Sequence, residues 1–231
     1  QWVCQRAHQS GGAEVFRTTH NALPGPLDGP PGLLARALRI RSMERDRIVR
    51  ALEGELSPRG LRDPQVHQAL VDLLDPSDEG IRLPPSRRHQ LVARVLGAMS
   101  DQRPAVIWLD DVQWGLEAID LCDHLVTSEH GVPCLVVLTV RDEALVEESD
   151  AQAALDDLLE HSRVTEIELR PLEGSASVAL IESGLGLQPN LAKRLQKRIA
   201  GNPMFAIELV GDWVERGLLV PTDRGFGLAD K

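Results

Sequence analysis

The stretch that decides the fold is Ala105-Val-Ile-Trp-Leu-Asp-Asp111, in which five apolar residues run unbroken into two adjacent aspartates. A second run, Cys134-Leu-Val-Val-Leu-Thr-Val140, is apolar except for Thr139 and ends in Arg141-Asp142. A helical pattern at about 116–129 separates the two runs. Unbroken apolar runs joined by a helix are typical of neighbouring parallel strands covered on both faces. The sequence therefore predicts an α/β fold built on a parallel sheet.

Shorter patterns predict the other elements of this region. Residues 14–19 form a strand, and residues 23–32, dense in Pro and Gly, form a loop. Helices are expected at about 33–56 and 64–75, and a third carries the apolar stripe from Leu91 to Met99. Thr165, Ile167 and Leu169 alternate with glutamates, which predicts a half-exposed strand near the sheet edge.

The character of the sequence changes after Leu172. Leu191, Leu195 and Ile199 recur at helical spacing, and Gly201-Asn-Pro203 interrupts the pattern with residues suited to a helix end, a cap and a first helical position. A further helix and a short β-hairpin over 218–228 complete the chain. We therefore predict two domains, at residues 1–171 and 172–231.

Composition and charge argue against several classes of protein, among them nucleic-acid-binding and membrane proteins. With 42% hydrophobic and 26% charged residues the chain resembles an ordinary globular protein. Its net charge of −10 argues against extensive nucleic-acid binding. The longest apolar run is too short to cross a bilayer and no signal-peptide pattern opens the sequence, so we expect a cytoplasmic location without membrane contact. The three cysteines are widely spaced, without CxxC or HExxH motifs, which supports neither a zinc site nor a disulfide framework; Cys134 is expected to be a small core residue.

The predicted strand ends carry the residues suited to chemistry. Ligands of open parallel sheets bind beyond the carboxyl ends of the strands, where Asp110, Asp111 and Arg141 are expected. One acid can hold Mg²⁺ through water, the next can orient or deprotonate an attacking water, and the arginine can contact a phosphate. Taken singly, the same acids are also typical of a turn or a helix cap, and Arg141 of a solvated loop charge.

At this point the chain resembles a family. Val106-Ile-Trp-Leu-Asp-Asp-Val-Gln-Trp114 resembles the Walker B segment of STAND ATPases, signal-transduction relatives of AAA+ proteins, as found in LuxR-type regulators and in bacterial proteins joined to adenylate cyclase or serine/threonine kinase domains. Thr139-Val-Arg141 resembles their sensor segment. Ile199-Ala-Gly-Asn-Pro-Met-Phe-Ala206 resembles the helical region that leads into their winged helix. The resemblance covers roughly residues 14–228.

The resemblance implies roles for individual residues. Asp110 would be the acid associated with Mg²⁺ through water, Asp111 the catalytic acid and Arg141 the sensor, and Pro203 would lie near the nucleotide base. ATP or ADP with Mg²⁺ would be the cofactors. Gln113 and Trp114 are characteristic of the motif, but the resemblance assigns them no role.

Two departures from the family pattern bear on activity. Trp114 is followed by Gly-Leu-Glu117 where Trp-Ala-Asp is usual, and Glu117 is an open candidate for the replaced acid. The chain contains no GxxxxGK[ST] phosphate-binding loop, and its three lysines all lie in the C-terminal part. The family's loop and its first strand would come just before Gln1. Either the native protein continues upstream, or the segment has rearranged and pairs with another chain.

The sequence thus leads to an incomplete P-loop NTPase-like domain followed by a helical, winged-helix-like region. Its expected function is that of a regulatory ATP-binding module in bacterial signal transduction or transcription regulation, in which hydrolysis switches attached effector domains or self-association. The isolated chain is expected to bind ATP weakly or not at all and to be inactive as an ATPase. The alternative is a non-catalytic interaction module. DNA binding through the winged helix is disfavoured by its acidic leading helix, and no GxSxG motif supports a hydrolase.

Overall fold

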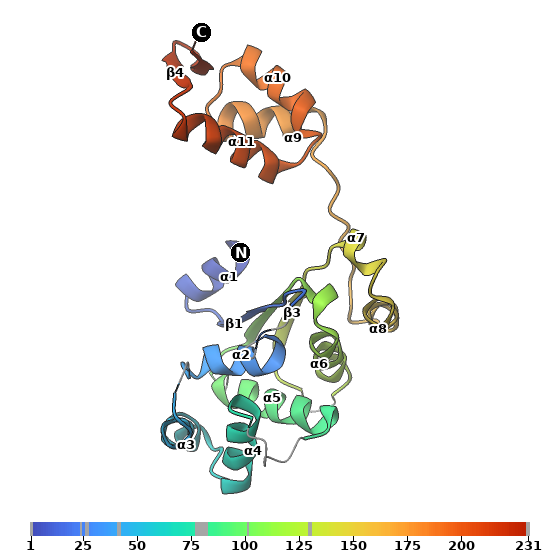
Figure 1. Ribbon diagram of the computed structural model, residues 1–231. Coiled ribbons are helices and arrows are strands. Elements are labelled where there is room, and N and C mark those ends of the chain that lie inside the picture. The colour runs from blue at the N-terminus through green and yellow to red at the C-terminus, as the bar shows by residue number, and fades with distance from the viewer. Residues whose placement is uncertain are drawn as a thin grey trace. The chain divides into compact units, whose positions relative to one another are not determined.

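The chain folds into two compact units, Gln1–Thr165 and Glu166–Lys231, in a computed structural model (Figure 1). The structure describes residues 2–23, 25, 28–40, 43–76, 83–100, 102–128 and 131–229. The units divide between Thr165 and Glu166, a few residues before the boundary expected at residue 172, and both positions lie in the connection between α8 (Ser149–Leu159) and α9 (Gly174–Ala179). Each unit has its own hydrophobic core.

Unit 1 contains a three-stranded sheet in the order β1-β2-β3, formed by β1 (Glu14–Thr19), β2 (Ala105–Asp110) and β3 (Cys134–Leu138). Both pairings are parallel, with Val15 opposite Val106 and Val106 opposite Leu135. Helix α6 (Leu116–Thr127) connects β2 to β3. The predicted α/β fold with a parallel strand–helix–strand unit is confirmed.

Seven further helices belong to unit 1 in the described residues. They are α1 (Trp2–Gln9), α2 (Gly29–Ala37), α3 (Arg45–Leu56), α4 (Pro64–Leu74), α5 (Pro85–Met99), α7 (Asp142–Leu145) and α8 (Ser149–Leu159), with short 3-10 turns η1 (Ser57–Arg59) and η2 (Val112–Trp114).

The single helix expected over residues 33–56 is wrong, because the structure has two helices there. Helix α2 starts earlier, at Gly29, inside the expected loop: Pro30 and Pro31 occupy its first turn, where a missing backbone N–H costs no hydrogen bond. The helix ends at Ala37, and two residues later Arg39 is left-handed, with φ of 56°. A left-handed residue cannot continue a right-handed helix, so α3 begins anew at Arg45.

The two faces of the sheet are covered unequally. One face carries Phe16, Ile107 and Leu109, which are buried in the main core with residues of α2, α5 and α6. The opposite face carries Trp108 and Leu135, and α1 lies on this side, away from α2 and α5 (Figure 1). Leu135 on β3 is 54% exposed. In the described residues no strand pairs with the outer edge of β1 or of β3, so both edges of the sheet are open.

The strand expected at residues 165–169 is absent. The segment has no strand partner in the described part of the chain, and Ile167 and Leu169 are 78% and 91% exposed. An alternating pattern determines which side chains can share a face, but a strand forms only where a neighbour supplies backbone hydrogen bonds. The expectation failed because the pattern carries no information about that neighbour.

Unit 2 consists of helices followed by a hairpin, as expected. Its elements are α9 (Gly174–Ala179), the π-helical turn η3 (Leu180–Gly184), α10 (Pro189–Ile199), α11 (Pro203–Glu215), β4 (Leu219–Thr222) and β5 (Gly225–Leu228). The Asn202 side chain caps α11 by accepting hydrogen bonds from the amides of Met204, at 2.9 Å, and Phe205, at 3.2 Å. The predicted cap and the predicted first-turn proline, Pro203, are confirmed.

None of the helices in the described residues is long and apolar enough to cross a membrane.

The buried centre of β2 should dominate the stability of unit 1. Ile107 is fully buried, so Ile107→Ala should lower the free energy of unfolding by about 2–5 kcal/mol through lost apolar burial and a cavity. Leu23 is 90% exposed, and Leu23→Ala should change it by less than about 0.5 kcal/mol. Urea denaturation followed by circular dichroism measures both. Equal effects of the two substitutions would contradict the described core.

Candidate functional site

The two aspartates and Arg141 come together at the carboxyl ends of β2 and β3, where the sequence placed them. The hub of this cluster is Thr139, which follows β3. Its hydroxyl donates to Oδ1 of Asp110 at 2.5 Å and accepts from the backbone N–H of Asp111 at 3.0 Å. Its own backbone N–H donates to the carbonyl of Leu109, and its carbonyl accepts from Val112, both at 3.0 Å. One residue thus ties the end of β3 to the turn after β2.

Asp111 adopts a left-handed conformation, with φ of 58° and ψ of 46°. For a residue other than glycine this conformation costs on the order of 1 kcal/mol, although aspartate tolerates it better than most. The hydrogen bonds from Asp111 and Val112 to Thr139 hold the turn in place. The strain turns the chain sharply from β2 into η2.

Arg17 on β1 also contacts the cluster and was missed in the sequence. Its Nη2 lies 2.8 Å from Oδ2 of Asp110, and its guanidinium carbon lies 3.9 Å from the ring centroid of Trp108. The register places Arg17 opposite Trp108, on the sheet face that α1 partly covers. The available signal was a basic residue in the middle of the predicted strand at 14–19. Both carboxylate oxygens of Asp110 are therefore engaged by the protein.

The charge state of Asp110 follows from these contacts. Burial alone would raise the pKa of Asp110, but the hydrogen bonds from Thr139 and Arg17, together with the positive charge of Arg17, outweigh it and hold this pKa below 3.8. Asp110 is therefore ionised at neutral pH.

Arg141 lies on the other side of Asp111. Its Nε donates to Oδ1 of Asp111 at 3.1 Å, and its side chain is 61% exposed. Gln113, which is only 1% exposed, donates from Nε2 to the same Oδ1 at 3.2 Å and accepts the backbone N–H of Arg141 through Oε1 at 3.2 Å. In the described residues, the terminal guanidinium nitrogens of Arg141 have no recorded partner.

Glu117, the candidate for the replaced acid, is engaged elsewhere in unit 1. Glu117 stands in the first turn of α6 and forms an ion pair with Arg88 of α5 at 2.7 Å, so it is engaged between helices. Pro203 belongs to unit 2, at the start of α11. Trp114 is half-buried in η2.

His20 also supports the turn that follows β2. His20, which follows β1, is buried, and its Nδ1 lies 2.9 Å from the backbone carbonyl of Asp110. A Cβ atom on Gly115 would lie 2.3 Å from Cδ2 of the His20 ring, so only glycine fits at the start of α6. The close packing of the His20 ring against Gly115 fixes the path of the backbone from the end of β2 into α6.

The donor set fits Mg²⁺ bound through water. Mg²⁺ prefers oxygen ligands and commonly keeps several waters. The side chains of Asp110 and Asp111 are 21% and 34% exposed, so water reaches both. Direct ligation at Oδ2 of Asp110 would require Arg17 to leave. Within the described ranges no three His, Cys, Asp or Glu side chains gather into a metal site, so a metal here would need further oxygens, such as those of a phosphate.

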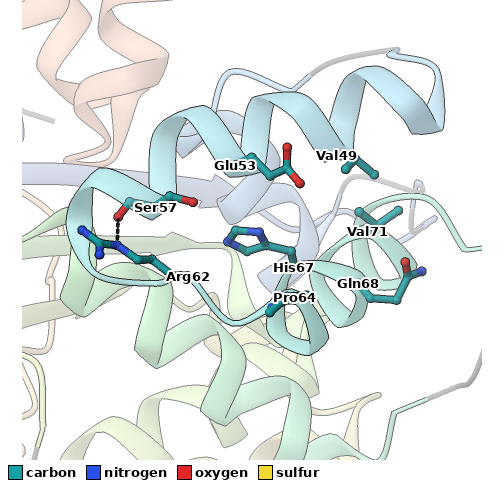
Figure 2. Close-up of a pocket in the computed structure, with 8 residues that line it drawn as sticks. All are labelled: Val49, Glu53, Ser57, Arg62, Pro64, His67, Gln68 and Val71. Carbon is teal, nitrogen blue, oxygen red and sulfur yellow. Dashed lines mark hydrogen bonds between the residues drawn. The ribbon is translucent and has the colours of Figure 1, made fainter.

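The chain also carries a pocket that the sequence did not predict. It has a volume of about 420 Å³ and lies between α3 and α4. Figure 2 shows the His67 ring in its middle and Arg62, hydrogen-bonded to the carbonyl of Ser57 at 3.2 Å, at one end. His67 itself contacts the carbonyl of Leu61 at 2.8 Å. The pocket contains none of the strand-end residues.

The cysteines take no part in the cluster. Burial raises the pKa of the Cys122 thiol to about 12 and also raises that of Cys134. Both thiols pack in the main core of unit 1, which is the role expected for Cys134.

Comparison with known proteins gives one match and no family. The chain is 28% identical, over 177 residues, to an uncharacterized protein of Rhizobium meliloti. The match covers 71% of this chain and 16% of that protein, so the chain spans only a small part of the relative's length. No family model matches the chain. No similar solved structure was found.

Thr139→Val should disrupt the strand-end cluster while preserving its shape. The pKa of Asp110 should rise, and the amide of Asp111 loses its acceptor, so the free energy of unfolding at pH 7 should fall by about 1–3 kcal/mol. A lowered pKa in the folded state stabilises above the unfolded value of about 3.9, and this contribution disappears as pH falls through the folded pKa. The difference between wild type and variant should therefore shrink below pH 4. Carboxyl ¹³C NMR titration and urea denaturation measure the two effects.

Thr139→Ser is the matched control, because it keeps the hydroxyl. It should leave the pKa of Asp110 below 3.8, as in the wild type. An unchanged Asp110 pKa in Thr139→Val would contradict the described hydrogen bond.

Gly115→Ala should destabilise unit 1 by about 1–3 kcal/mol, because the new methyl group collides with the His20 ring. If the clash is the cause, the loss caused by Gly115→Ala should be smaller when it is introduced into a His20→Ala background. A double-mutant cycle in urea tests this; strictly additive effects would exclude the steric explanation.

Proposed function

We propose that this chain is part of a STAND-type ATP-binding module of a bacterial signalling or transcription-regulatory protein. The observation that carries the proposal is the hydrogen-bonded cluster of Asp110, Asp111, Thr139 and Arg141 at adjacent parallel strand ends. Strand carboxyl ends are where open α/β sheets bind their ligands. An ionised acid, a second acid and a partly free arginine match the charges that phosphoryl transfer to water requires.

Each residue then has a role in hydrolysis. Asp110, kept ionised by Thr139 and Arg17, holds Mg²⁺ through water. Asp111 orients the attacking water. Arg141 contacts the γ-phosphate through the terminal nitrogens that are not bonded to Asp111. Mg²⁺ held through water by Asp110 would neutralise part of the charge on the transferred group.

The phosphate-binding loop is the part of the site that this chain does not contain. In the described residues the outer edge of β3 is unpaired, which leaves room for a further parallel strand beside it. The exposed Leu135 supports a further covering element on that face, because parallel strands are normally buried on both faces. We infer that this strand leads into the loop. Unit 2, with its helices and hairpin, is then a winged-helix-like region, and hydrolysis switches its arrangement to control attached effector domains or self-association.

The second candidate is a non-catalytic interaction module with the same fold. The ion pair between Arg17 and Asp110 favours it, because this arginine occupies the carboxylate that would serve the metal. A module of this kind would keep the cluster as a structural tie and bind no nucleotide.

Fluorescent ATP binding in the presence of Mg²⁺ distinguishes the two. The present chain should bind weakly, and the longest reading frame that contains it should bind at least tenfold more tightly. Asp110→Ala should weaken that binding. Asp157→Ala, an exposed acid on α8, is the matched control and should not. If the longest frame does not bind, the switch is excluded and the interaction module is favoured.

A further inference from the structure

Gln113 is the buried residue of the cluster to which the proposed hydrolysis assigns no role. It lies in the 3-10 turn η2, between the end of β2 and the start of α6, and is 1% exposed. A buried primary amide costs stability unless its polar atoms are bonded. Both polar atoms of Gln113 are bonded, and both partners belong to the strand-end cluster.

The orientation of this amide is fixed by its partners. The backbone N–H of Arg141 can only donate, so it must face Oε1, and the Asp111 oxygen accepts from the amide, so it must face Nε2. Exchanging the two amide atoms would break both bonds. Gln113 therefore specifies one arrangement of Asp111 relative to Arg141.

The two donors to Asp111 converge on one oxygen. Gln113 Nε2 at 3.2 Å and Arg141 Nε at 3.1 Å both contact Oδ1. No donor to Oδ2 is recorded among the residues that the structure describes. The anchored Oδ1 fixes the carboxylate and leaves Oδ2 as the oxygen that can accept a hydrogen bond from water.

We propose that Gln113 is a positioning residue, which holds Asp111 through Oδ1 and Arg141 through its backbone so that Oδ2 of Asp111 is presented to the attacking water. This role rests on the proposed ATP hydrolysis. It gives the buried glutamine of the Asp-Asp-Val-Gln-Trp segment a function that packing alone does not require, because Gln113 touches neither the phosphate nor the water.

The first arm of the test needs no nucleotide. Gln113→Met keeps the length of the side chain and removes both hydrogen bonds. Amide hydrogen exchange of Arg141, followed by NMR in the present chain, should become at least tenfold faster in this variant. Gln113→His, whose neutral ring has one donor and one acceptor nitrogen, should restore part of the protection. Gln68→Met removes another glutamine-to-aspartate bond, on α4, and should leave Arg141 unchanged.

The second arm measures hydrolysis by the longest reading frame that contains the chain. Gln113→Met should lower kcat by roughly 10- to 100-fold, as expected for a misplaced reacting group, and change KM by less than about threefold. Gln113→His should recover part of kcat. A merely structural glutamine would lower stability without this separation of kcat from KM.

The outcomes are distinguishable. Unchanged Arg141 exchange in Gln113→Met, or faster exchange with unchanged kcat, would overturn the positioning role. A wild-type frame that binds no ATP would overturn the proposed function, and with it the catalytic part of the inference. The exchange arm would then still decide whether Gln113 fixes Asp111 against Arg141.

Discussion

The hydroxyl and backbone of Thr139 make the set of contacts on which the rest of the strand-end cluster depends. Thr139 takes part in four hydrogen bonds: it donates to Leu109 and Asp110 and accepts from Asp111 and Val112. They keep Asp110 ionised, hold Asp111 in a strained left-handed turn and fix the separation of the two strand ends. Arg141 follows two residues later, so its position is set by the same tie. Parallel pairing brings the carboxyl ends of β2 and β3 close together, and the hydrogen bonds of Thr139 fix how the residues there are arranged.

Each aspartate of the cluster is paired with an arginine of the same chain. Arg17 pairs with Asp110 and Arg141 with Asp111, Thr139 donates to the other oxygen of Asp110, and Gln113 donates to the same Asp111 oxygen as Arg141. Because both arginines are substantially exposed, at 46% and 61%, their ion pairs are weak and exchangeable in water. A ligand that brings its own charges can therefore take over either arginine. We expect this exchangeability to matter for a site that alternates between occupied and empty states.

The sequence was sufficient to predict the elements that depend on local pattern. The apolar runs at Ala105 and Cys134 predicted β2 and β3, and Asn202 was identified as a cap, because each signal lies within a few residues. The strand predicted at residues 165–169 was wrong, because a strand forms only beside a partner strand and the local pattern gives no information about that partner. The break after α2 was missed because Arg39 gives no sign of a left-handed conformation.

The same distinction applies to the site. Asp110, Asp111 and Arg141 could be found because strand ends are predictable from the apolar runs. Arg17 was missed, and Thr139 was noted only within the sensor-like segment. Their contacts with Asp110 depend on strand register and join residues 93 and 29 positions apart. Gln113 was noticed as part of a motif, but its function depends on a backbone amide 28 residues away. These roles follow from contacts between residues far apart in the sequence, which residue type alone does not reveal.

We propose that Asp111 orients the water that attacks ATP at the strand-end cluster. The decisive measurement is single-turnover hydrolysis of radiolabelled ATP by the longest reading frame containing this chain, compared between wild type and Asp111→Asn. We expect Asp111→Asn to bind ATP within about threefold of wild type and to hydrolyse it at least a hundredfold more slowly, a loss of about 2.7 kcal/mol in transition-state stabilisation. Equal hydrolysis rates, or no hydrolysis by the wild type, would contradict it.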